Sequence, residues 1–131
     1  MIAPIISPIL VIVLFVLGCL HLLWAFGSTF PCANEQALAR AVVGRRGITR
    51  MPSALSCMVV AFCLFGAAIL AAMLGGYVTL PLPSLVWKGL LILAGLAAGL
   101  VFLGRGVIGI LPAFERSAPE MPFLTLNRRV Y

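Results

Sequence analysis

The sequence contains no aspartate, three glutamates and a single histidine. Without aspartate the chain lacks a Ser/His/Asp triad, and its few acids form no recognisable pair of catalytic carboxylates. It also lacks the pattern of histidines and cysteines that a zinc site needs. The four cysteines show no CxxC spacing, and no glycine-rich nucleotide motif follows a predicted strand. We therefore predict no catalytic residue, no metal and no cofactor, which argues against an enzyme.

Charge is also scarce. Only 9% of the residues are charged and 63% are hydrophobic, whereas soluble domains average about 25% charged residues. Such a chain cannot cover a water-facing surface, so the lipid bilayer is the expected solvent. The net charge of +6 does not indicate a nucleic-acid partner, because the basic residues lie at the ends of apolar runs and form no soluble basic face.

Three apolar runs cover residues 9–26, 54–74 and 85–111. At about 1.5 Å per helical residue, even the shortest spans about 27 Å, close to the ~30 Å hydrocarbon core of a bilayer. A cleaved signal peptide is disfavoured for the first run, which is long and lacks a basic leader. The prediction is one all-α domain, an integral membrane helical bundle with three transmembrane helices, a connecting loop at 27–53 and a tail at 112–131.

Basic residues set the expected orientation, since basic loops stay on the cytoplasmic side during insertion. Eight of the nine basic residues fall on one side of the predicted bundle and Lys88 falls on the other. The N-terminus is then outside and the C-terminus cytoplasmic, with the basic side facing anionic lipids. Residues 34–43 also predict a short helix in the loop, capped by Asn34. The eight residues are Arg40, Arg45, Arg46, Arg50, Arg105, Arg116, Arg128 and Arg129.

Small residues recur at helical spacing in all three runs, and one face of the third run is small where the opposite face is leucine-rich. Small residues let membrane helices approach closely. We therefore predict helix-packing positions at Gly18, Ala25, Ala61, Ala68, Ala71, Gly75, Gly95 and Gly99.

Three polar residues are predicted to meet in the inner leaflet. His21 lies on the small face of the first run with Trp24 beside it, and Arg105 lies on the small face of the third run at a comparable depth. A loop carbonyl or Glu35 would complete this cluster. The cluster either pins the helices together or holds an anionic headgroup or small anion, and His21 is either a hydrogen-bonded structural residue or a proton-transfer residue.

Three short motifs occur in an order that resembles the pattern of a known family. These motifs are HLLWAFG at residues 21–27, RGVIG at 105–109 and FLTLNRRVY at 123–131. They are similar to the small bacterial membrane proteins catalogued as domain of unknown function 3995. The resemblance implies an inner-membrane location and a further helix after the tyrosine, which is either absent from this member or beyond the sequence. It implies no activity.

For function, the leading expectation is a structural or accessory subunit. Three helices with small-residue faces offer more packing surface than they can use among themselves, so other membrane subunits or further copies of the chain are the expected partners. The alternative is a carrier or membrane enzyme that binds a small molecule or lipid around His21 and Arg105.

Overall fold

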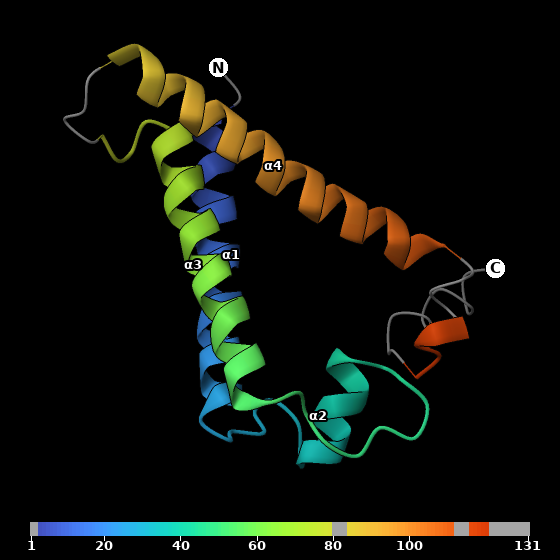
Figure 1. Cartoon of the computed structure of the whole chain (residues 1–131). Coiled ribbons are helices and arrows are strands. Elements are labelled where there is room, and N and C mark those ends of the chain that lie inside the picture. Colours follow the sequence, from blue (N-terminus) through green and yellow to red (C-terminus); the bar gives the residue numbers. More distant parts are fainter. Residues whose placement is uncertain (1–2, 80–83, 112–115, 121–131) are drawn as a thin grey trace.

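The computed structural model of the chain describes residues 3–79, 84–111 and 116–120. Within these residues the fold is all-helical and without strands, with α1 (Ala3–Ala25), α2 (Glu35–Val42), α3 (Ala54–Leu74) and α4 (Ser84–Ile110) in chain order (Figure 1). By length and composition, α1, α3 and α4 can each cross a membrane. The predicted fold class is thereby confirmed. Arg128 and Arg129 lie outside the described residues.

The helix ends follow from local chemistry. The described part of α1 starts at Ala3, six residues before the predicted run, and it accommodates Pro4 because the first turn of a helix needs no backbone N–H there. α1 ends at Ala25 and is followed by Gly27, which has a φ of +85°, and the Ser28 N–H donates to the Leu23 carbonyl at 3.0 Å. This bond is that of a Schellman motif. α2 is capped as predicted, since the Asn34 side chain accepts from the Ala37 N–H at 2.8 Å.

α1 and α3 pack side by side along their length (Figure 1). The Phe65 ring lies over Gly18, where an added Cβ would come within 2.6 Å of it, and it also contacts the Phe15 ring at a centroid distance of 5.5 Å. Near the other end, the Ser7 hydroxyl donates to the Ala71 carbonyl at 2.6 Å. We call these two helices the α1/α3 pair. The residues that α3 buries are Cys57, Ala61, Leu64 and Ala68.

α4 meets the pair near its own N-terminal half and then diverges from it (Figure 1). At the contact, a Cβ added to Gly95 would lie 2.8 Å from a methyl group of Leu74. Further along α4, a Cβ added to Gly99 would meet nothing within 4 Å. α4 is therefore attached to the pair near one end and leaves a space that widens toward its C-terminus.

The loop and the tail form a second, smaller unit, which we call the α2–tail cap (residues 34–51 and 116–120). α2 buries Leu38, and Ala118 of the tail is also buried. The Glu120 N–H donates to the Gly44 carbonyl at 3.0 Å, and the Glu120 carboxylate faces the Arg40 Nε at 3.4 Å. The chain after α4 is thus joined to the loop before α3.

Candidate functional site

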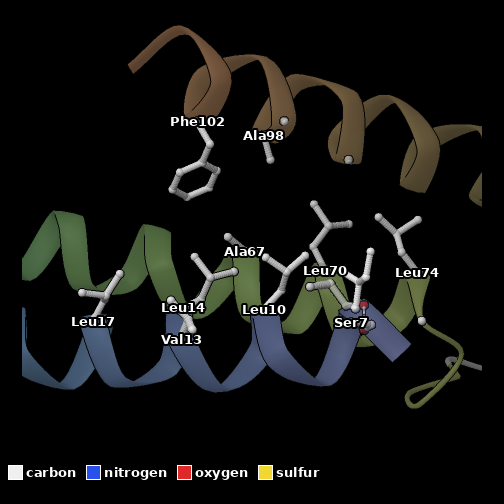
Figure 2. Close-up of a pocket in the computed structure, with 15 residues that line it drawn as sticks. Ser7, Leu10, Val13, Leu14, Leu17, Ala67, Leu70, Leu74, Ala98 and Phe102 are labelled. Carbon is white, nitrogen blue, oxygen red and sulfur yellow. Dashed lines mark hydrogen bonds between the residues drawn. The ribbon is translucent and has the colours of Figure 1, made fainter. Parts of the chain in front are cut away.

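A feature of the described residues that could hold a ligand is the space between α4 and the α1/α3 pair, which we call the cleft. Its volume is about 640 Å³. In Figure 2, Phe102 points from α4 toward the pair, whose leucines face it from α1 and α3. Of the described residues that line it, only Ser7 has a polar side chain, and its hydroxyl already donates to the Ala71 carbonyl. The lining residues are Ile6, Ser7, Leu10, Val13, Leu14, Leu17, Ala67, Leu70, Ala71, Leu74, Gly75, Gly95, Ala98, Gly99 and Phe102.

His21 and Trp24 lie together at the C-terminal end of α1. The His21 Nδ1 is 2.8 Å from the Leu17 carbonyl, and because a carbonyl only accepts, Nδ1 carries the proton of this bond. The two rings are in contact, with centroids 4.7 Å apart and planes tilted by 56°. The Trp24 indole N–H donates to the Phe30 carbonyl at 2.7 Å. His21 is thus bound to its own helix, while Trp24 fastens the following loop to α1.

Arg105 is exposed on α4, and none of the described residues forms a hydrogen bond or ion pair with it. His21 and Trp24 therefore lie together as predicted, and the loop carbonyl of Phe30 accepts from Trp24. Within the described residues, no hydrogen bond or ion pair links Arg105 to either of them. Glu35 lies in the α2–tail cap, where its carboxylate accepts from the Met51 N–H at 3.0 Å.

The predicted packing positions divide into two groups. Gly18, Ala61 and Ala68 are buried in the α1/α3 pair, and a Cβ added to Gly75 would collide with Ser7. Gly95 contacts Leu74, whereas Gly99 is exposed and lines the cleft. The half-buried members are Ala25, Ala71, Gly75 and Gly95.

Two residues that organise the helix contacts were not singled out from the sequence. Phe65 fills the space above Gly18, and Ser7 bonds across the pair. Ser7 does carry a signal, because it is a polar residue at the start of an apolar run, and such a group needs a hydrogen-bond partner inside a membrane. Nothing in the pattern distinguishes Phe65 from the other phenylalanines.

Besides Arg40, the loop exposes Arg45, Arg46 and Arg50, and none of these three has an ion-pair partner in the described part of the chain. The two described acids are both used inside the α2–tail cap, Glu35 by Met51 and Glu120 by Arg40 and Gly47. One Glu120 carboxylate oxygen is shut off from solvent and faces Arg40 without a well-aligned hydrogen bond. The loop consequently presents an uncompensated basic surface.

Three apolar helices, a basic loop and an apolar cleft define a multi-pass α-helical membrane protein in contact with the lipid bilayer. The chain belongs to the family described as protein of unknown function (DUF3995), which matches residues 14–131. Comparison with curated proteins and with solved structures gave no match. The family's description names no activity, so function has to be argued from the molecule itself.

Proposed function

We propose that this protein is a structural accessory subunit of the bacterial inner membrane, which packs through α4 against helices of other membrane subunits or of further copies of itself. The observation that carries the proposal is the burial of the three spans. In α1 and α3, 17% and 22% of the span is buried, whereas in the described span of α4 the share is 0%. α4 is the helix with the most surface left for a partner.

The physical reason is that lipid does not drive helices together. Lipid tails are as apolar as leucine, so two membrane helices associate through close packing and interhelical hydrogen bonds. On α4 the sides away from the cleft are uncovered, with Leu100 and Val101 each 68% exposed. Such a helix inserts because it is hydrophobic, and it keeps its packing surface for another helix.

The accessory role can be tested in the protein's own membrane. A photo-crosslinking residue at Leu100 on α4 should capture another membrane protein, whereas the same residue at Ile12 on α1, which is 63% exposed, should capture fewer. Blue-native electrophoresis of the untagged protein should show a species larger than the free chain. Migration only as a free chain, with no protein captured at Leu100, would contradict the accessory role.

The proposed orientation places the N-terminus outside and the α2–tail cap in the cytoplasm, against anionic lipids. It is supported by the exposed Arg45, Arg46 and Arg50 in the loop and by Lys88 near the opposite end of α4. Cys32 offers a test, because it lies in the loop and is partly exposed, whereas Cys19 lies within a span. A membrane-impermeant maleimide should label Cys32 in inverted vesicles and leave it unlabelled in intact cells; the reverse pattern would refute the orientation.

A further inference from the structure

The size of the cleft restricts what can occupy it. Its volume of about 640 Å³ lies within the ~300–1,000 Å³ range of small-molecule pockets. The cleft therefore has the volume of a site for a small molecule.

The chemistry of the walls restricts the occupant further. Leu10, Leu14 and Leu17 of α1 face Ala98 and Phe102 of α4 across the cleft (Figure 2). The Ser7 hydroxyl, the one polar side chain of the lining, already donates to Ala71. A polar molecule would lose its hydrogen bonds to water there without regaining them, at considerable cost. The occupant is a hydrocarbon, and in a membrane the abundant hydrocarbon is a lipid acyl chain.

A positive charge lies beyond the open end of the cleft. Arg105 follows Phe102 by three residues and Ala98 by seven, so it lies on the same side of α4 about one turn further on. It is exposed and has no described partner, and the described acids Glu35 and Glu120 are bonded within the α2–tail cap. Within the described residues this guanidinium is therefore available to an anion. Arginine binds phosphate well because its planar guanidinium can donate two parallel hydrogen bonds.

The distance from Arg105 to the closed end of the cleft matches the length of one lipid acyl chain. Arg105 lies ten residues after Gly95, where Leu74 closes the cleft. At about 1.5 Å per residue this is about 15 Å along α4, which is comparable to the length of an acyl chain that spans half of the ~30 Å hydrocarbon thickness. A tail whose phosphate lies at Arg105 reaches the point where α4 meets the pair.

From the size, walls, charge and length of this site we propose that the cleft binds one anionic phospholipid, with an acyl chain between α4 and the α1/α3 pair and its phosphate on Arg105. The lipid fills the space that side chains leave empty and supports α4 where it diverges. This inference goes beyond the accessory role, which does not depend on it. The two proposals can fail independently. The lipid site is tested by lipid binding to the purified chain, and the accessory role is tested by cross-linking to other proteins in the membrane.

Native mass spectrometry of the full chain tests the proposal. The protein is purified in mild detergent and given an equal mixture of phosphatidylcholine and phosphatidylglycerol with identical tails. We expect one tightly bound lipid per chain, with phosphatidylglycerol favoured about fivefold, because one basic residue near the surface contributes that much preference for an anionic lipid. Arg105→Gln should abolish the preference while a lipid still binds. Lys88→Gln, which removes the other positive charge of α4 at its opposite end, should leave the preference unchanged.

A matched pair of glycine variants tests the tail site. A Cβ added at Gly99 or at Gly104 meets nothing within 4 Å, so both Gly99→Leu and Gly104→Leu can fold, but only Gly99 lines the cleft. Gly99→Leu should lose the bound lipid and Gly104→Leu should keep it, with equal helicity by circular dichroism. Equal lipid binding in both variants would overturn the tail site, and equal binding of the two lipids by the wild type would overturn the role of Arg105. Capture of a protein instead of a lipid by a photo-crosslinker at position 99 in native membranes would show that a partner helix occupies the cleft.

Discussion

Where α1 meets α3, a glycine is covered by a side chain of the neighbouring helix, whereas of the described glycines of α4 only Gly95 meets another helix. At Gly18 an added Cβ would come within 2.6 Å of the Phe65 ring. At Gly95 it would come within 2.8 Å of a Leu74 methyl group, which can rotate away, and at Gly99 it would meet nothing within 4 Å. A glycine permits close approach without enforcing it. A large side chain on the neighbouring helix decides whether the two helices pack.

The largest effect is expected where a glycine is already covered. Gly18→Leu forces a side chain into the Phe65 ring and should destabilise the fold by about 1–3 kcal/mol, the usual cost of overpacking. Gly66→Leu is the matched control on α3, since its Cβ would meet nothing within 4 Å. Thermal unfolding in detergent, followed by circular dichroism, measures both. Equal melting temperatures would contradict the close packing of Phe65 on Gly18.

The two tryptophans allow a comparison between a residue of the α1/α3 pair that donates a hydrogen bond, Trp24, and a residue of α4, Trp87. Trp24→Phe removes the 2.7 Å hydrogen bond from the indole to the Phe30 carbonyl and should cost about 0.5–1.5 kcal/mol. Trp87→Phe, near the start of α4, removes no indole hydrogen bond that the described residues make, and it should cost less. Hydrogen exchange at residues 26–32 should rise in the first variant and stay unchanged in the second. A larger loss of stability for Trp87→Phe would contradict the structure.

Ser7→Ala should produce a smaller loss, because it deletes the bond from the hydroxyl to the Ala71 carbonyl across the pair. Bonds between helices in membranes contribute about 0.6 kcal/mol on average. The measurement is unfolding in a titration of denaturing detergent, and the expected change is a small shift in midpoint without a change in helix content. An unchanged midpoint would show that packing alone holds this end of the pair.

Gly104→Leu should have the smallest effect and the opposite sign. The residue lies within α4, its Cβ would meet nothing within 4 Å, and leucine favours a helix over glycine by up to about 1 kcal/mol. The melting temperature should stay the same or rise slightly. A clear loss of stability would mean that α4 is packed on this side in the protein as purified.

The membrane spans and the capped loop helix could be predicted because their causes are local. α3 occupies the predicted residues 54–74, α4 lies within one residue of the predicted 85–111, and Asn34 caps α2 as expected. The closeness of His21 and Trp24 is equally local, since they lie three residues apart on one helix. The divergence of α4 was not predictable, because helical periodicity identifies a small-residue face without identifying the neighbour that covers it. The place of Arg105 beyond the cleft depends on that divergence.

The bond between the loop and the tail has a mechanical consequence. Leu111 and Arg116 are five residues apart, a reach of at most about 18 Å, so the end of α4 cannot travel far from the α2–tail cap that Glu120 joins to Arg40 and Gly44. α4 is anchored near its start by Leu74 against Gly95 and near its end by this bond. The α1/α3 pair, α4 and the α2–tail cap lie along three sides of a triangle (Figure 1). The contact at the start of α4 and the link between the loop and the tail therefore both limit the width of the cleft.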